Sequence, residues 1–368
     1  MDRAKSGKGI PFFLLTFVIL LFALGILMIF DTTSAEVIDR NLKLNTHYAL
    51  HKQLIYGCLS VFLCLLVYFF GYLKFLEISP YLFYGFTLLL LLVFIPGIGQ
   101  QINGACRWLS LGPFSFQPSE FMKVVIPTHF IYLFMKREGD MKYFYRIISV
   151  ISVPIFLILI EPDNGSAFII VLTMVSLFFI CHVRLSYWLL PILLLGGVGG
   201  IVALQMPHVR ERICTYLYPE KDLLGRGHQP YQAKIAAGSG GLYGRGIGES
   251  LQKLNYLPES RSDYIAAIYA EEFGFIGMLF LVLLYLSFTR TGFYIAFRAN
   301  QRAGFYLAAI MTFLISFQAF LNLGVVSGLL PSKGINLPFF SQGGSSLFAN
   351  SIAVTLIMST YRVEEWNV

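Results

Sequence analysis

The sequence predicts an all-α polytopic membrane protein that crosses the bilayer with ten helices. Hydrophobic residues make up 57% of the 368 residues and charged residues 13%, whereas a soluble domain has roughly 45–50% and about 25%. Ten apolar runs approach the length needed to cross a hydrocarbon core about 30 Å thick. These runs lie at residues 10–30, 54–71, 79–95, 119–135, 145–160, 165–182, 186–204, 264–288, 303–326 and 344–361.

The first run ends in FDTTSAEVIDR, where SAE is a poor small-x-small cleavage site. We therefore interpret residues 10–30 as a retained helix rather than a cleaved signal peptide. The shortest of the other runs must extend into their flanks to span the bilayer.

The basic residues of the short loops predict that both termini are cytoplasmic. With the N-terminus inside, the inner segments carry 13 Lys and Arg residues and the short outer loops carry 5, as the positive-inside rule requires. The net charge of +7 is explained by these loops, so we do not expect a nucleic-acid partner. The expected location is the cytoplasmic (inner) membrane.

The longest segment between runs, residues 205–262, is predicted to be a large extracytoplasmic loop within a single membrane domain of residues 1–368. Loops of this length are usually functional, and its mixture of aromatic and charged residues favours short helices at the membrane surface. It contains GSGGLYGRGIGES, which does not fit a dinucleotide-binding fingerprint. Two interpretations remain open: a turn-rich connector, or a backbone that approaches a ligand closely.

Two other outer segments are informative. In residues 101–120, Arg107 precedes Trp108, a pair suited to an interfacial anchor. Residues 331–347, PSKGINLPFFSQGGSSL, are too polar and too rich in Gly and Pro to span, so we expect them to fold over the outer mouth of the bundle.

Ionisable side chains within spans are costly and usually face one another or a cavity. Glu120 and Lys123 are three residues apart, which predicts a local ion pair, although the lysine also lies where it would reach a lipid phosphate. Glu271 and Glu272 point about 100° apart on a helix, so we expect at least one to pair with a distant cation. Asp163 is suited to capping the helix that follows it.

Asp263 differs from these acids because it lies at the outer surface, immediately before a long helix that would fix its position. From the residues alone, catalysis and N-capping both remain open for it. The predicted outer side also carries cations suited to a lipid-linked phosphate or to anionic headgroups. These cations are Arg107, Lys123, Arg210, Arg212, Lys253 and Lys333.

Four stretches together resemble the SEDS family, which includes FtsW, RodA and SpoVE. They are NGACRWLSLGPFSFQPSEFMK, EPDNGSA, the segment from YQAKIAAGSGGLYGRGIGES through LQKLNYLPESRSDYIAAIYAEEFGFIG, and GLLPSKGINLPFFSQGGSSL. The last stretch is more similar to the division and sporulation members than to the elongation member. The sequence departs from the family at Glu161 and Asn164, which replace the Gln and Leu of QPDLG.

The resemblance implies a GT-C-like fold and a peptidoglycan glycosyltransferase that polymerises lipid II outside the cytoplasmic membrane. Its implied partners are a class B penicillin-binding transpeptidase and other membrane proteins of the division complex. The family's essential aspartate falls on Asp263. We predict that substrate is bound by Arg107, Lys123, Arg212, Gln232, Lys253, Glu259, Lys333 and Ser345, while Glu120, Asp163, Glu271 and Glu272 are structural.

The implied reaction inverts the anomeric centre, so a single displacement with one general base is sufficient, because pyrophosphate leaves without an acid. We expect a divalent cation, Mg or Mn, to assist at the pyrophosphate; no organic cofactor and no protein metal site are expected. Two alternatives remain open: a lipid II flippase, which would depend on charges at the midplane, and a non-catalytic scaffold for the transpeptidase. The sequence shows no matched broken helices, which weighs against transport.

Overall fold

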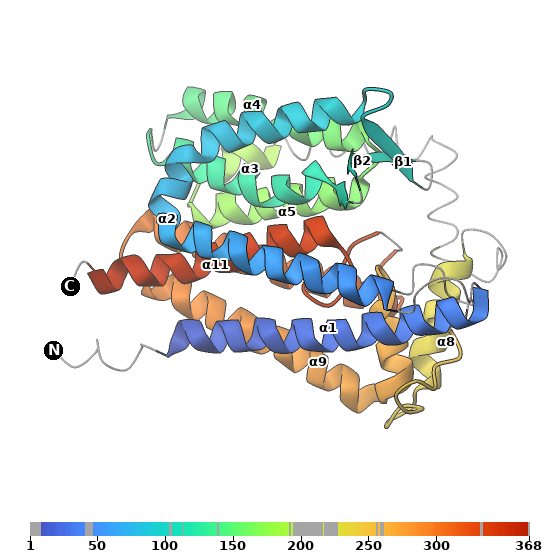
Figure 1. The fold of residues 1–368 in the computed structure, drawn as a ribbon. Helices are drawn as coiled ribbons and strands as arrows, with labels where there is room; N and C mark the ends of the chain where they lie inside the picture. The colour runs from blue at the N-terminus through green and yellow to red at the C-terminus, as the bar shows by residue number, and fades with distance from the viewer. Residues whose placement is uncertain are drawn as a thin grey trace.

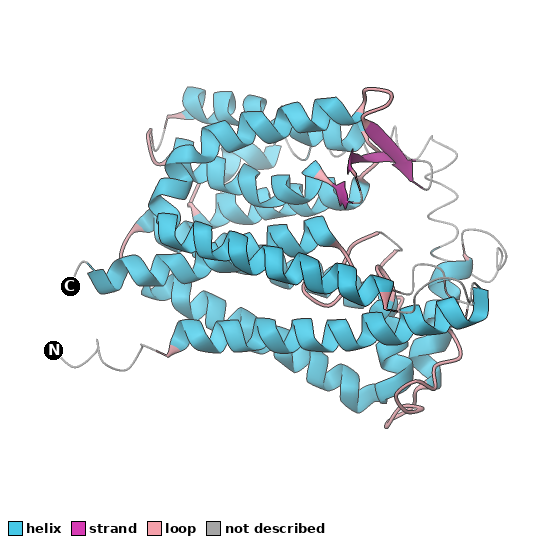
Figure 2. Ribbon diagram, in the orientation of Figure 1, coloured by secondary structure: helices cyan, strands magenta, loops and turns pink. Residues whose placement is uncertain are grey.

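A computed structural model describes residues 9–40, 47–102, 105–112, 114–137, 140–190, 193, 216, 227–254, 257, 261–331 and 334–366. Most of them are helical (Figure 2). The helices are α1 (Ile10–Arg40), α2 (Tyr48–Val93), α3 (Pro118–Phe134), α4 (Met141–Ile160), α5 (Asn164–Ile180), α8 (His228–Ser239), α9 (Ile265–Arg298), α10 (Arg302–Val326) and α11 (Gly344–Trp366). The strands are β1 (Gly99–Ile102), β2 (Ala105–Leu111) and β3 (Phe114–Phe116).

Helix α2 combines two of the predicted spans. Its 46 residues would extend about 70 Å as one straight helix, more than twice the thickness of a bilayer core. The backbone leaves the helical region at Gly71 (φ 75°, ψ 158°), and α2 doubles back there (Figure 1). The runs predicted at 54–71 and 79–95 are therefore two antiparallel legs.

The prediction of an all-α polytopic membrane protein is confirmed. Among the described residues, five helices are long and apolar enough to cross a membrane, and α5 is apolar but shorter. Nine of the ten predicted runs fall on helices of the described chain. The tenth, at 186–204, lies mostly outside the described residues, so the count of ten stays a prediction.

The two ends of the bundle differ in what they carry. The first residues of α1 and the last residues of α11 lie at one end, whereas the strands and α8 lie at the other (Figure 1). We call these the terminal end and the loop end. The chain's outer segments, as predicted from the sequence, gather at the loop end.

The small sheet was not predicted. Strands β1, β2 and β3 form an antiparallel meander between the second leg of α2 and the start of α3. Trp108 pairs with Gln100, and the register shifts between Gln100 and Gln101. The sheet adds strands to an otherwise helical fold and places Arg107 at the loop end.

Residues 334–343, which we call the inserted segment, do not fold over the mouth as predicted. Ile335, Leu337 and Phe340 are at most 4% exposed, because the segment enters the bundle between helices. A Cβ on Gly25 of α1 would lie 2.6 Å from the carbonyl oxygen of Phe340, so α1 packs directly on this backbone. The fold therefore buries a non-helical stretch where its polar groups are satisfied by protein.

Candidate functional site

The backbone immediately before α9 is tied to α10 and to the inserted segment. The side-chain amide of Asn322 donates to the carbonyl oxygens of Asp263 (2.8 Å) and Ile335 (2.7 Å). The Ser341 hydroxyl donates to the carbonyl oxygen of Ser262 (2.6 Å), and the Gln342 amide donates to that of Arg261 (3.0 Å). Asp263 is thus positioned by elements far along the chain.

The side chain of Asp263 is half-buried and lies against glycine backbone. A Cβ on Gly334 would lie 3.1 Å from Oδ2 of Asp263, and a Cβ on Gly165 would lie 3.1 Å from the Gly334 carbonyl oxygen. Gly165 belongs to the first turn of α5. The Asp263 carboxylate, Gly334 and the N-terminus of α5 are therefore in successive contact, with the partial positive charge of that helix end nearby.

Asp163 joins the first turns of three helices. Its Oδ1 accepts the amide of Ser166 in α5 (3.2 Å), and its Oδ2 accepts the Ser119 hydroxyl (2.8 Å) and the Gln117 side-chain amide (3.1 Å). The backbone amide of Gln117 in turn donates to the hydroxyl of Ser345 at the start of α11 (2.9 Å). Asp163 is 2% exposed. Its Oδ1 caps α5, and its Oδ2 holds the start of α3 against α5; we call this set of contacts the Asp163 clamp. Ser345, predicted to bind substrate, is part of this clamp.

Arg107 and Glu161 meet at the turn between α4 and α5. The Arg107 guanidinium donates from Nε to the carbonyl oxygen of Glu161 (3.2 Å) and from Nη2 to that of Pro162. The Glu161 side chain is 1% exposed, and neither carboxyl oxygen has a hydrogen-bond partner among the described residues. Burial, together with the charge of Asp163, raises the pKa of Glu161 to about 8, although Arg107 opposes the shift. The carboxyl is therefore mainly neutral at pH 7.

Lys123 is held inside the bundle rather than at its mouth. Its ammonium donates to Glu120 Oε1 (2.8 Å) and to the side-chain oxygen of Gln318 in α10 (3.2 Å). The lysine is 4% exposed. Contact with a lipid phosphate would require breaking this buried pair, so the geometry favours the local ion pair over the predicted role in substrate binding.

The glycine-rich stretch packs against a break in α9. The α9 backbone is non-helical at Gly274 (φ 66°), which frees carbonyls before the break and amides after it. The amides of Arg245 and Gly246 donate to the carbonyls of Glu271 and Glu272, and the amides of Phe275 and Ile276 donate to the carbonyls of Gly241 and Leu242. Of the two interpretations left open for this stretch, the described contacts agree with a turn-rich connector, because the close backbone approach is to α9.

Glycine is required at this contact for steric reasons. A Cβ on Gly244, where φ is +81°, would lie 2.0 Å from the carbonyl oxygen of Glu272. The protein itself satisfies the backbone groups that the break at Gly274 frees.

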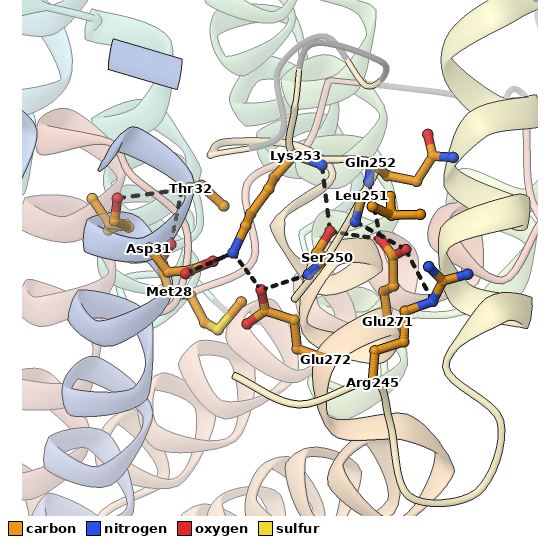
Figure 3. A network of polar contacts seen from close by, with 11 residues as sticks. Met28, Asp31, Thr32, Arg245, Ser250, Leu251, Gln252, Lys253, Glu271 and Glu272 are labelled. Atoms are coloured by element: carbon orange, nitrogen blue, oxygen red, sulfur yellow. Dashed lines mark hydrogen bonds and ion pairs between the residues drawn. The ribbon is translucent and has the colours of Figure 1, made fainter. Parts of the chain in front are cut away.

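Glu271 organises the turn after the glycine-rich stretch (Figure 3). Its carboxylate accepts the Ser250 hydroxyl (2.6 Å) and the backbone amides of Leu251 and Gln252 (3.3 Å each). Arg245 lies 3.5 Å from the same carboxylate. These contacts fix the loop that carries Lys253.

Lys253 bridges this loop to α1 (Figure 3). Its ammonium lies 2.8 Å from Asp31 of α1 and 2.8 Å from Glu272 of α9, and the residue is 6% exposed. Burial lowers the pKa of Lys253, but its hydrogen bonds to Asp31 and Glu272 outweigh this effect and raise the pKa above the ordinary value. Lys253 thus joins its own loop to α1 and α9 through buried ion pairs, which disfavours the predicted contact with substrate.

The remaining predicted residues divide into two groups. Gln232 is half-buried on α8, whereas Arg212, Glu259 and Lys333 lie outside the described residues. In the described part of the chain, no group of three or more His, Cys, Asp or Glu is placed to hold a metal ion. The described residues alone therefore do not build a site for the expected divalent cation.

Comparison with known proteins agrees with this architecture. Residues 12–365 match the family described as "Cell cycle protein", FtsW/RodA/SpoVE. The chain belongs to this family. It is 36% identical over 348 residues to a probable peptidoglycan glycosyltransferase FtsW of Coxiella burnetii, covering 92% of each chain. It is 34% identical over 372 residues to the stage V sporulation protein E of Bacillus subtilis, covering 100% of each.

A solved structure supports the same fold assignment for this FtsW/RodA/SpoVE chain. The match, at a TM-score of 0.75 and 25% identity, covers 95% of this chain and 97% of the other. That structure is described as "Structural coordination of polymerization and crosslinking by a peptidoglycan synthase complex".

Three residues of this region were missed by reasoning from the sequence. Asn322 is an amide inside an apolar run, and a buried polar residue of that kind is the signal that would have identified it. Asp31 directly follows the first apolar run, where a polar flank is expected. Glu161 departs from the family pattern, but its burial depends on the tertiary fold.

Proposed function

We propose that this protein is a peptidoglycan glycosyltransferase that polymerises lipid II at the outer face of the cytoplasmic membrane. The observation that carries the proposal is the fixed position of Asp263 at the loop end, where Asn322, Ser341 and Gln342 hold its backbone segment. A general base needs this kind of preorganisation. The names of the relatives support the same reaction.

In the proposed mechanism, Asp263 accepts the proton of the 4-hydroxyl of the incoming lipid II sugar. The hydroxyl oxygen attacks the anomeric carbon of the donor, and the bond to pyrophosphate breaks with inversion. The weakly basic pyrophosphate needs no protonation as it leaves, so one carboxylate is sufficient. General-base assistance of this kind contributes about 10² to 10⁴ in rate.

The pyrophosphate requires cations, and Arg107 is the described candidate. It is half-buried at the loop end, whereas Lys123 and Lys253 are occupied in buried ion pairs. Arg212 and Lys333 stay candidates from the sequence. A divalent ion would have to take most of its ligands from the pyrophosphate, as magnesium often does. Removal of divalent ions by a chelator is expected to slow polymerisation, and unchanged polymerisation would reject the ion.

We also propose that both termini face the cytoplasm and that the protein acts at the division site. The excess of basic residues in the predicted inner segments supports the orientation. A class B penicillin-binding transpeptidase is the proposed partner. The solved structure in which one chain shares the fold of this protein is described as a complex for polymerization and crosslinking, which supports a crosslinking partner. Other division-complex membrane proteins are proposed to join it.

The deciding experiment compares purified wild type with Asp263→Asn in lipid II polymerisation, with and without the cognate transpeptidase. The substitution is nearly isosteric, so loss of glycan with an unchanged unfolding temperature is expected. Asp140→Asn is the matched control, because Asp140 is an exposed helix cap at the opposite end of the bundle. Near-wild-type polymerisation by Asp263→Asn would exclude the base; no glycan from wild type with partner and Mg²⁺ present would favour the flippase or the scaffold.

A further inference from the structure

A cavity lies at the terminal end of the bundle, remote from Asp263. Its volume is about 230 Å³, and it opens between the end of α3, the start of α4 and the turn after α5. Arg137, Tyr143, His182, Arg184 and Tyr187 line it together with buried apolar side chains that include Phe144. Neither the proposed reaction nor the family comparison uses this cavity.

Two arginines from different loops face this cavity across aromatic rings. The guanidinium carbon of Arg137 lies 5.6 Å from the centroid of the Tyr143 ring, and that of Arg184 lies 5.9 Å from the centroid of the Tyr187 ring. Within the described residues, neither arginine forms an ion pair with a carboxylate. Both guanidinium groups therefore keep donors for an anion while their stems are held by the rings.

The acid at the rim does not neutralise both arginines. Asp140 Oδ1 accepts the backbone amides of Lys142 and Tyr143 at the N-terminus of α4, and one carboxylate offsets at most one of the two arginine charges. Lys142 and Arg146 add further positive charge on the first turns of α4. Neither of these two residues lines the cavity. Its described lining carries two arginines against one carboxylate, above buried apolar side chains.

We propose that this cavity binds the phosphodiester headgroup of an anionic membrane phospholipid. Arginine recognises phosphate through paired hydrogen bonds, and basic pockets between helices at the cytoplasmic surface suit such headgroups. The cavity is smaller than a typical pocket for a drug-sized ligand, so it suits a headgroup whose chains stay in the bilayer. The inference depends on the proposed orientation of the termini but not on the proposed glycosyltransferase reaction.

The test measures retention of phosphatidylglycerol by native mass spectrometry of the full-length protein in detergent, with phosphatidylcholine for comparison. Each arginine near a membrane surface contributes about 1 kcal/mol to the binding of anionic lipid, which is roughly 5-fold in affinity. The double variant Arg137→Gln, Arg184→Gln is therefore expected to retain phosphatidylglycerol roughly 25-fold more weakly. Arg290→Gln combined with Arg298→Gln is the matched control. It removes the same charge from α9 and includes an arginine over a tyrosine ring, Arg298 on Tyr294, yet neither residue lines the cavity.

Equal retention by the two double variants would overturn the proposal. The second arm of the test uses inorganic phosphate as the competitor. If millimolar phosphate displaced phosphatidylglycerol and raised the unfolding temperature of the protein as much as the lipid does, a free anion would be the occupant, and the proposal would also be overturned. If the double variant does not fold, photoactivatable phosphatidylglycerol added to wild type decides. Crosslinks to residues 134–147 or 181–188 support the site, and crosslinks elsewhere refute it.

Discussion

Substitution of Asn322 gives the most specific test of the site, because this one side chain links the backbone of Asp263 to the inserted segment. Asn322→Leu keeps the approximate volume but removes both donors, leaving the carbonyls of Asp263 and Ile335 without this partner. An unpaired buried acceptor costs about 1–3 kcal/mol. Since Asp263 is half-buried and water reaches its carbonyl more easily, we expect a total loss of about 2–4 kcal/mol.

The loss of activity is expected to be larger than the loss of stability suggests. A displacement of about 1 Å in a catalytic group can cost about 10²-fold in rate, so polymerisation at a temperature where the variant is folded is expected to fall by that order. The assay combines thermal unfolding in detergent with initial rates of lipid II polymerisation. Thr312→Val is the control on the same helix, because its hydroxyl donates only to the carbonyl of Ala308 one turn earlier.

The design also separates positioning from general damage. In an Asp263→Asn background, Asn322→Leu should lower stability as before but should cause no further loss of polymerisation, since the group that it positions is already absent. Wild-type stability and rate for Asn322→Leu would refute the reasoning. So would a rate loss in Asn322→Leu equal to that of Thr312→Val.

Three further substitutions test the surrounding structure. Glu161→Gln should stabilise the protein relative to wild type increasingly as pH rises from 4.5 to about 8, because folded wild type keeps a proton on Glu161 that the unfolded chain releases. The gain in free energy of unfolding is at most about 5 kcal/mol, and an equal gain in unfolding temperature at pH 5 and pH 8.5 would contradict it. Gly244→Ala should destabilise the protein by more than about 4 kcal/mol. Gly248→Ala should cost only about 1–2 kcal/mol, because Gly248 has a φ of +87° but nothing lies within 4 Å of the position of its Cβ. Similar unfolding temperatures for the two variants would argue against the contact with α9. Lys253→Met should cost about 3–5 kcal/mol, because it leaves Asp31 and Glu272 buried without a cation; loss of substrate affinity at unchanged thermal stability would instead support the role in substrate binding.

The helices were predictable because their signal is local. A bilayer requires apolar segments of a minimum length with internally satisfied backbones, and each such run can be recognised without its neighbours. The sheet was not predictable on this basis, because β1 to β3 are short and lie in a polar stretch between spans. The inserted segment was misplaced because its polar and Gly-rich composition resembles that of a surface loop, while Asn322, Ser341 and Tyr285 satisfy its polar groups inside the bundle.

The candidate site was predictable in its residue types but not in its partners. The sequence identified Lys123 as a costly cation within a span and Lys253 as a cation of the outer loop. Their partners lie far away in the chain: Gln318 is 195 residues from Lys123, and Asp31 is 222 residues before Lys253. No spacing rule connects residues so far apart. The glycine-rich stretch illustrates the same limit, because its composition left a connector and a ligand-binding backbone both open, and only the fold identifies α9 as the surface that it approaches.

The acids at the start of α9 serve different purposes, and their arrangement suggests how the site is stabilised. Glu271 and Glu272 attach the 245–253 loop and, through Lys253, α1 to the first turns of α9 (Figure 3). Asn322 and the inserted segment hold the backbone just before the helix from the other side. Asp263 belongs to the second set of contacts and lies eight residues before Glu271 in the chain. The backbone of Asp263 is therefore held directly by Asn322, whereas the contacts of Glu271 and Glu272 fix the helix that follows it.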